Sequence, residues 1–301
     1  MLYIAGSGYS IGVELQLERI TITIDDTLLR QIDNTIDGHE VKNRSHAIDR
    51  ILKKALSSTL ARQAVVLAGG SDERLALPSG KTIKPLLEVG GKPVIEHIIG
   101  QFKKFGLDEA IICLSMQGEG MKAKLQEGKS IGMKINYLWE NSPSGSAGGL
   151  LLAKPLVKDT FILSYADVLY DELDISDMIQ FHKANKALCT LALANVRDAK
   201  NYGVAKMRGS QIIDFSEKPD STSSNLVNAG IAICEPEIFD LYKPGIKSFE
   251  SDLLPLIAEK QKLFGYVYSG PWFELGSQTQ VDAAKKYYSP KKEDAGEEKK
   301  G

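Results

Sequence analysis

Short apolar strands alternate with amphipathic helices from Gln63 to about Tyr288, and this alternation constrains the fold more than any other feature of the sequence. Each apolar run is short enough for a buried strand, and the helices carry their apolar residues on one face. Such an order predicts a mostly parallel sheet covered by helices on both faces. The expected strands are Ala64–Leu67, Ala110–Leu114, Lys134–Trp139 and Thr160–Ser164, with helices around Ile95–Phe102, ending at Gly106, and near Gly148.

From Ala187 onward short strands dominate, which predicts a mixed extension at one side of the sheet. The sequence therefore favours the α/β class, a Rossmann-like mixed sheet flanked by helices. A length of 301 residues with 43% hydrophobic and 25% charged residues is typical of a globular protein with one or two domains. The strands expected in this half are Leu188–Leu193, Gly203–Met207, Gln211–Phe215 and Gly230–Cys234.

The charge and the cysteines narrow the setting of the protein. A formal net charge of -2 gives no chain-wide positive field for nucleic acid. The three cysteines lie in apolar strand-like runs without metal-ligand spacing, which favours buried, reduced thiols and a cytoplasmic protein. No apolar run approaches the ~20 residues that span a bilayer, so we expect no membrane partner.

A separate pattern precedes the sheet. Ile20, Ile22 and Ile24 alternate with polar residues as in a strand, and Asp25 offers a helix N-cap. A first helix should then run to Gly38, and a second should begin near Lys42–Ser45. One strand with an unpaired edge cannot bury enough apolar surface alone, whereas two copies could pair their strands.

The segment Arg19–Leu56 resembles the ribbon-helix-helix family over that family's whole length. The resemblance implies a homodimer or higher even oligomer, with DNA as a further partner. DNA contacts would come from Arg19, Thr21 and Thr23 on the strand and from Asn43, Arg44 and Ser45 at the second helix. Against DNA binding, residues 13–62 hold eight basic and eight acidic residues, and phosphate neutralisation dominates DNA affinity. We expect a loose extension at 1–12, this module at 13–61, an α/β domain at 62–288 and a disordered tail at 289–301.

A glycine-rich turn follows the first strand of the α/β domain. Leu67-Ala68-Gly69-Gly70 runs into Arg74 and then Lys84-Pro85. Glycines let backbone N–H groups approach a polyphosphate closely, and the two cations would offset its charge. A plain strand-to-helix turn would also contain glycine, but the spacing of Arg74 and Lys84 and the later Gly91-Lys92-Pro93 favour phosphate binding.

At these residues the chain resembles the sugar-1-phosphate nucleotidyltransferases, also called sugar-nucleotide pyrophosphorylases. Further motifs of that family follow in the same order over roughly Gln63–Tyr288. They are Glu140–Gly148, Ala166-Asp167, Tyr202–Val204, Glu217–Pro219, Asn228–Gly230 and Trp272–Gly276. The implied fold is that of the nucleotide-diphospho-sugar transferases, and the substrates are an NTP and a sugar 1-phosphate.

The resemblance also implies roles for single residues. Asp167 and Glu274 stand where the family binds Mg²⁺, although Glu274 replaces the usual aspartate. Each could instead be a strand-end cap or a surface carboxylate. Arg74 and Lys84 are the expected catalytic cations. Nucleotide binding is implied for Leu67, Ala68, Gly69, Gly70, Glu140, Gly145 and Ser146, and sugar-phosphate binding for Glu217, Lys218 and Asn228.

The expected reaction is in-line attack by the sugar phosphate on the α-phosphorus of the NTP. Within the family, the resemblance favours the mannose- or heptose-1-phosphate guanylyltransferases, or the glucose-1-phosphate uridylyltransferases. Asp72 departs from the family, because a glycine usually occupies this position of the phosphate-binding turn. A second hypothesis is therefore a ribbon-helix-helix transcriptional regulator that senses a sugar nucleotide through a weakly active or inactive transferase domain.

Overall fold

The computed structural model describes residues 21–39, 41–58, 61–69, 74–77, 80–115 and 118–289. Contacts divide the chain into two units, Met1–Leu52 and Lys53–Gly301. Several predictions concern residues outside the described ranges: the extension at 1–12, Arg19, Gly70, Asp72 and the tail after Ser289. In the described residues, no helix is both long and apolar enough to span a bilayer.

The two helices expected before the sheet are present as α1 (Asp26–Asp33) and α2 (Arg44–Ser58), and the first unit includes α2 up to Leu52. The Asp25 side chain accepts a hydrogen bond from the backbone N–H of Leu28, which confirms the predicted N-cap. The prediction that α1 runs to Gly38 was wrong. The N–H groups of Thr35 and Ile36 bond three residues back, and this tightening ends the helix early.

No strand is assigned over residues 21–25 of this single chain, although a strand was expected at Ile20–Ile24. A strand is defined by its pairing, so a lone extended segment does not form one. The small core of the unit consists of Ile32, Val41 and Ala47, with Ile24 packed against it.

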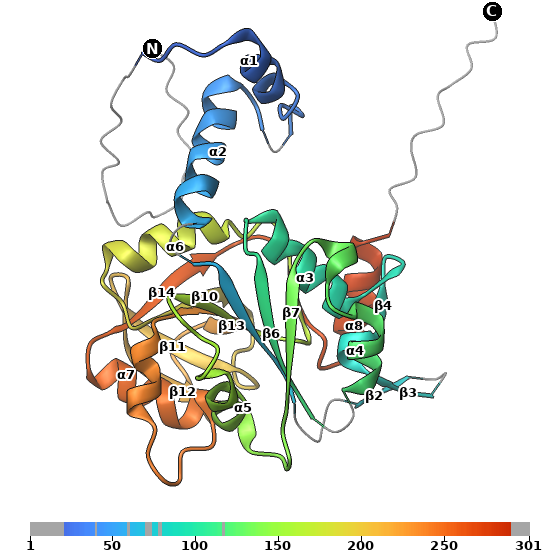
Figure 1. Ribbon diagram of the computed structural model, residues 1–301. Helices are drawn as coiled ribbons and strands as arrows, with labels where there is room; N and C mark the ends of the chain where they lie inside the picture. Colours follow the sequence, from blue (N-terminus) through green and yellow to red (C-terminus); the bar gives the residue numbers. More distant parts are fainter. Residues whose placement is uncertain are drawn as a thin grey trace, which may run out of the picture. The chain divides into compact units, whose positions relative to one another are not determined.

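The second unit is built on a nine-stranded sheet (Figure 1). Its order is β10-β14-β12-β11-β13-β8-β1-β6-β7, with a further pairing of β10 and β13. The strands β7, β6, β1 and β8 are parallel, whereas β13 joins β8 antiparallel. This confirms a parallel half and a mixed half. The bounds are β1 Gln63–Ala68, β6 Glu109–Leu114, β7 Lys134–Trp139, β8 Phe161–Tyr165, β10 Cys189–Asn195, β11 Gly203–Arg208, β12 Gln211–Glu217, β13 Leu226–Cys234 and β14 Leu263–Tyr268.

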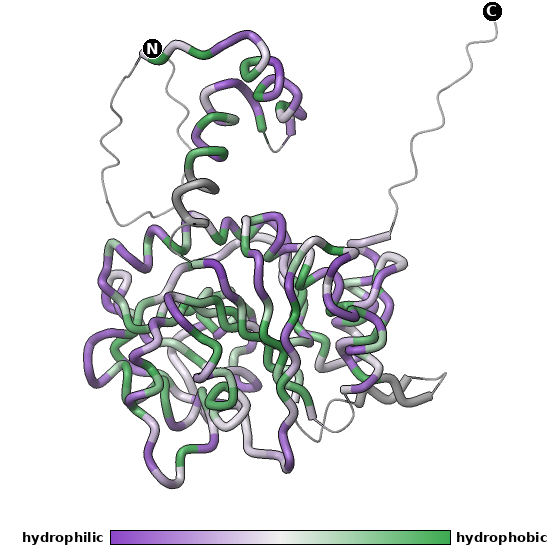
Figure 2. Tube along the Cα trace, viewed as in Figure 1, coloured by the Kyte–Doolittle hydropathy of each residue, from purple (hydrophilic) through white to green (hydrophobic). Residues whose placement is uncertain are grey.

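Side chains alternate between two cores, one on each face of the sheet. In β1, Ala64 and Val66 belong to one core, whereas Val65 and Leu67 belong to the other. Strands buried on both faces read as continuous apolar runs, as they do here. Figure 2 shows the hydrophobic segments gathered in the inner strands of this unit, with hydrophilic segments along the outer loops and helices.

Helices cover both faces, as the sequence predicted. The first core includes residues of α3, α4, α6 and α8, and the second includes residues of α5 and α7. The helix expected near Gly148 begins three residues earlier, and α4, α6, α7, α8 and β14 were not predicted from the sequence. The bounds are α3 Val94–Lys104, α4 Glu119–Leu125, α5 Gly145–Ala153, α6 Ile175–Ala184, α7 Leu254–Glu259 and α8 Gln278–Tyr287.

Short elements complete the unit. Three two-stranded ribbons pair β2 with β3, β4 with β5, and β9 with β15. All three cysteines are free and buried, as predicted. The remaining bounds are β2 Arg74–Leu77, β3 Gly80–Ile83, β4 Glu88–Val89, β5 Lys92–Pro93, β9 Val168–Tyr170, β15 Trp272–Glu274, η1 Lys84–Leu86, η2 Lys129–Ile131, η3 Pro236–Leu241 and η4 Phe249–Leu253.

A charged cluster ties α6 to the sheet. Glu235, directly after β13, accepts hydrogen bonds from Lys183 at 2.7 Å and Thr160 at 2.8 Å, and it bonds the buried His182 at 3.1 Å. Burial alone would raise the pKa of Glu235, but the bonds to His182, Lys183 and Thr160 outweigh burial and lower this pKa to about 2. The ionised carboxylate therefore stabilises the packing of α6.

Glu235→Gln should lower the free energy of unfolding at pH 7 by about 2 kcal/mol. Because the folded state lowers the pKa from 4.5 to about 2, the contribution is complete above pH 4.5. It is lost as the pH falls toward 2. Urea unfolding of both proteins at pH 7, 5 and 3 checks this, with the exposed Glu259→Gln as the control. A difference of the same size at pH 3 and pH 7 would contradict the role of the charge.

Candidate active site

The carboxyl ends of β1 and β8 bring the first site residues together. Leu67 pairs with Tyr165 in parallel register, and the N–H of Ala166 donates to the carbonyl of Leu67 at 3.1 Å. Gly69 follows β1 directly, and Asp167 lies two residues after the end of β8. Ligands of open α/β sheets bind at this edge, where loops leave the carboxyl ends of the strands.

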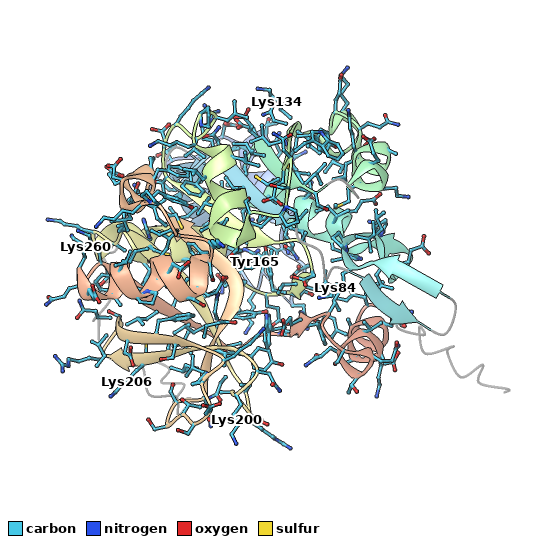
Figure 3. The ribbon with its side chains drawn as sticks, turned by 90° about the horizontal axis from the view of Figure 1, so that it is seen from below. Lys84, Lys134, Tyr165, Lys200, Lys206 and Lys260 are labelled. Atoms are coloured by element: carbon cyan, nitrogen blue, oxygen red, sulfur yellow. The ribbon has the colours of Figure 1, made fainter. Side chains whose placement is uncertain are left out.

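A cation and a carboxylate meet at this edge although they are 83 residues apart in sequence. Lys84 begins the short helix η1, and its Nζ lies 3.0 Å from Oδ2 of Asp167. The two side chains are 17% and 28% exposed, so the pair is shielded but still reachable from solvent. Figure 3 shows Lys84 and Tyr165 toward the middle of the view, whereas Lys134, Lys200, Lys206 and Lys260 lie around the periphery.

Glu274 approaches Asp167 through the ribbon of β15 and β9. Glu274 pairs with Val168, and the N–H of Leu275 donates to the carbonyl of Asp167 at 3.0 Å. Burial raises the pKa of Glu274, and the charge of Asp167 raises it further, against the lowering effect of Lys84 and Lys218. A cation bound beside Glu274 and Asp167 would offset the repulsion that raises the pKa of Glu274.

This pair fits a hard divalent cation. In the described residues, no group of three or more His, Cys, Asp and Glu side chains could hold a metal. Mg²⁺ prefers oxygen ligands and is commonly held by one or two carboxylates together with phosphate oxygens and water. Asp167 and Glu274 therefore match a metal that a phosphorylated substrate would help to bind.

A cavity of about 180 Å³ lies beside this pair. Its lining includes all three residues predicted to bind a sugar phosphate: Glu217 at the end of β12, Lys218 after it and Asn228 in β13. Asp167 and Glu274 line the same cavity. Burial raises the pKa of Glu217, and the charge of Glu250 raises it further. The cavity is thus rich in carboxylates, with Lys218 as the basic residue in its lining.

A second, more apolar cavity of about 130 Å³ is lined by five of the predicted nucleotide-binding residues: Leu67, Gly69, Glu140, Gly145 and Ser146. Ala68 does not join them, because its side chain lies in the core on the opposite face of the sheet. Gly70 lies outside the described residues, and of Arg74 the structure describes only the backbone, at the start of β2. Tyr165 lines both cavities and therefore stands between them.

Glu140 is buried in the wall of this second cavity, with 5% exposure. The Ser144 hydroxyl donates to its Oε1 at 2.5 Å. A Cβ at position 69 would lie only 2.4 Å from the other carboxylate oxygen, so glycine is needed there for Glu140 to approach the end of β1. Gly145 is needed as well, because its φ is +77° and a Cβ would lie 2.2 Å from the carbonyl oxygen of Lys247.

The residues predicted for DNA contact are described only in part. Thr21, Thr23 and Ser45 are exposed. The Asn43 side chain caps α2 by accepting from the N–H of His46. Arg44 is bound to Asp33 through two hydrogen bonds, at 2.6 and 2.7 Å, which offset its positive charge.

Tyr165 and Glu250 are among the cavity residues that the sequence did not predict. Tyr165 lies only two residues before Asp167, so its position beside a motif was an available signal. Glu250 lies in η4, outside every motif used for the prediction, and only tertiary structure brings it to the cavity. Trp272 and Tyr202 belong to recognised motifs but were not assigned roles, and both line the larger cavity.

The α/β unit of this chain is similar to known proteins. Residues 63–289 match the nucleotidyl transferase family. The chain is 32% identical over 219 residues to the mannose-1-phosphate guanylyltransferase catalytic subunit beta of Dictyostelium discoideum, covering 71% of this chain and 61% of that protein. It is 30% identical over 219 residues to the mannose-1-phosphate guanylyltransferase of Mycobacterium tuberculosis, again covering 71% and 61%. The chain thus spans about three fifths of the length of these relatives.

The fold agrees with a solved structure. HddC from Yersinia pseudotuberculosis superposes with a TM-score of 0.66 at 23% identity, covering 76% of this chain and 100% of that one. That likeness concerns the fold alone. Because the family match extends over more than half of the sequence, the chain belongs to the nucleotidyl transferase family.

Proposed function

We propose that this chain transfers a nucleoside monophosphate from an NTP to a sugar 1-phosphate, giving an NDP-sugar and pyrophosphate. The observation that carries the proposal is the placement of Lys84, Asp167 and Glu274 beside a polar cavity, with Tyr165 separating that cavity from a more apolar one. A sugar 1-phosphate fits the first cavity and a nucleobase fits the second. The names of the relatives, mannose-1-phosphate guanylyltransferases, support this choice over a regulator with an inactive domain.

In the proposed reaction an oxygen of the sugar phosphate attacks the α-phosphorus of the NTP, and the bond to the leaving pyrophosphate breaks. The attacking phosphate is already anionic, so the step needs no general base and no covalent intermediate. The protein must hold two anions together and offset their charge. Lys84, beside Asp167, and Lys218, in the lining of the polar cavity, would offset this charge. Arg74 would be a third cation. Mg²⁺ held by Asp167 and Glu274 would neutralise phosphate charge.

Glu140 favours guanine as the base. An ionised carboxylate only accepts hydrogen bonds, so it needs adjacent donors on the base. Guanine offers N1–H and the 2-amino group side by side. Uracil and thymine offer one N–H between two carbonyl oxygens, which the carboxylate would repel. Adenine and cytosine place a ring acceptor beside their amino group. The buried position of Glu140 strengthens this selection, because a buried acceptor that meets no donor on the base is costly.

Lys84→Ala should lower kcat for pyrophosphate release about 100- to 1000-fold, because it removes a cation beside the reacting phosphates. Release is measured with GTP and mannose, heptose or glucose 1-phosphate, and the NDP-sugar is identified by mass spectrometry. The control is Lys260→Ala, an exposed lysine at the periphery (Figure 3). Near-normal turnover of Lys84→Ala would refute its role. Wild-type protein that released no pyrophosphate with any NTP and sugar phosphate would refute the proposed function and favour the regulator.

Glu140→Gln should reduce the preference for GTP over UTP and dTTP by about 10- to 100-fold in kcat/KM, since it replaces the acceptor for two donors by a group that also donates. Competition assays with paired nucleotides measure the ratio directly. The buried Ser144 contact makes folding a concern, so the melting temperature is compared in parallel. An unchanged ratio in a folded variant would exclude Glu140 from base selection.

We further propose that the N-terminal unit is a ribbon-helix-helix module that dimerises the enzyme. Ile22 is 50% exposed and Leu28 48% exposed in the single chain, and a paired strand would cover such side chains. The mass in solution should be at least twice 32.9 kDa. Light scattering should give a monomer for Ile22→Glu and a dimer for Thr23→Glu, and two dimers would contradict the pairing.

DNA binding is the weaker alternative, because Asp33 offsets the charge of Arg44. A gel shift at a defined salt concentration tests it.

A further inference from the structure

Glu250 is a half-buried carboxylate of the sugar cavity to which the proposed reaction gives no role. It lies in η4, the single turn Phe249–Leu253, and lines the 180 Å³ cavity together with Glu217. Neither its charge nor its position is needed for the metal pair, which Asp167 and Glu274 provide. The proposed reaction therefore does not explain the contacts of Glu250.

Three hydroxyl groups hold Glu250 in place. Tyr165 donates to Oε1, while Ser146 donates to Oε2 at 2.9 Å and Ser248 donates to the same oxygen at 3.2 Å. The oxygen of Ser146 also accepts from the backbone N–H of Phe249 at 2.8 Å, so its proton is directed toward Glu250. The carboxylate is thus fixed before any ligand arrives.

The Glu250 carboxylate can accept one more hydrogen bond than these three hydroxyl groups provide. A carboxylate has about four lone-pair sites, and the three hydroxyls occupy one each. Because Glu250 lines the cavity, the remaining site is available to a ligand there. Placing this carboxylate near Glu217 is unfavourable, since the charge of Glu250 raises the pKa of Glu217. Donor groups on a bound ligand would offset that repulsion.

We propose that Glu250 is a specificity-determining residue that accepts a hydrogen bond from one hydroxyl of the sugar. This inference rests on the proposed function. The cavity then takes sugars that carry a free hydroxyl at the position facing Glu250 and disfavours sugars that lack it. A site built to bond a hydroxyl rejects an analogue without that hydroxyl strongly, because its own polar group is left unpaired.

A structural role for Glu250 is the competing explanation. Ser146 and Gly145 belong to the turn that starts α5, and the N–H of Ala147 donates to the carbonyl of Lys247 at 3.0 Å. Glu250 could therefore serve only to join this turn to η4. In that case its loss would weaken turnover of every sugar by one common factor, because no substrate group would be involved.

The test compares the sugar 1-phosphate that the wild type uses best with its monodeoxy analogues, in wild type and Glu250→Gln. In the wild type, removal of one particular hydroxyl should lower kcat/KM about 10- to 100-fold. In Glu250→Gln the penalty for that same position should shrink to less than about 3-fold, while the penalties at the other positions stay. The exposed Glu259→Gln serves as the matched control and should keep all wild-type penalties.

Unchanged penalties in Glu250→Gln, or an equal loss for all sugars, would overturn the inference and leave the structural role. If Glu250→Gln does not fold, Glu250→Asp replaces it, since it keeps the charge but withdraws the carboxylate by one methylene, and the same comparison decides. Failure of the proposed function reads differently: the wild type itself would release no pyrophosphate with any sugar phosphate.

Discussion

The parallel pairing of β1 with β8 is the constraint on which the site depends. Its last hydrogen bond, from Ala166 to Leu67, fixes where both strands end, and the glycine turn and Asp167 follow at the same edge. Two further site groups are placed relative to that edge: Lys84 by its ion pair with Asp167, and Glu274 by the ribbon of β15 and β9. The two apolar cores hold the register, because a slip of one residue in either strand would exchange the faces.

The carboxylates of the polar cavity repel one another when no ligand is bound. Asp167, Glu217, Glu250 and Glu274 line one cavity, and burial together with mutual repulsion raises the pKa of Glu217 and of Glu274. The repulsion would be weaker if the four carboxylates were farther apart, but the sheet and the ribbon of β9 and β15 hold them around one cavity. Such an arrangement is typical of a binding site, because a bound cation and the donor groups of a ligand would offset the repulsion.

The sequence predicted the elements that follow from local patterning. β7 lies at Lys134–Trp139 as expected, and Asp25 caps α1. Lys84 and Asp167 could be joined only through the ordered motifs, because nothing local in either segment specifies a partner 83 residues away. Glu250 could not be found at all, since η4 carries no motif and reaches the cavity by packing against α5 and β12. The strand expected at Ile20–Ile24 is not assigned over residues 21–25 of the single chain, because a strand is defined by its pairing and no partner strand is present there.

The two cavities are linked rather than independent. Tyr165 lines both, and Ser146, from the wall of the 130 Å³ cavity, donates to Glu250 in the wall of the 180 Å³ cavity. The turn that presents Ser146 also donates the Ala147 N–H to Lys247, so a shift of this turn would move η4 and Glu250 with it. A base bound against Glu140 and Ser146 would steady that turn, and the same contacts would then steady the acceptor for the sugar. Contacts of this kind would align two bound substrates without any group that reacts with either.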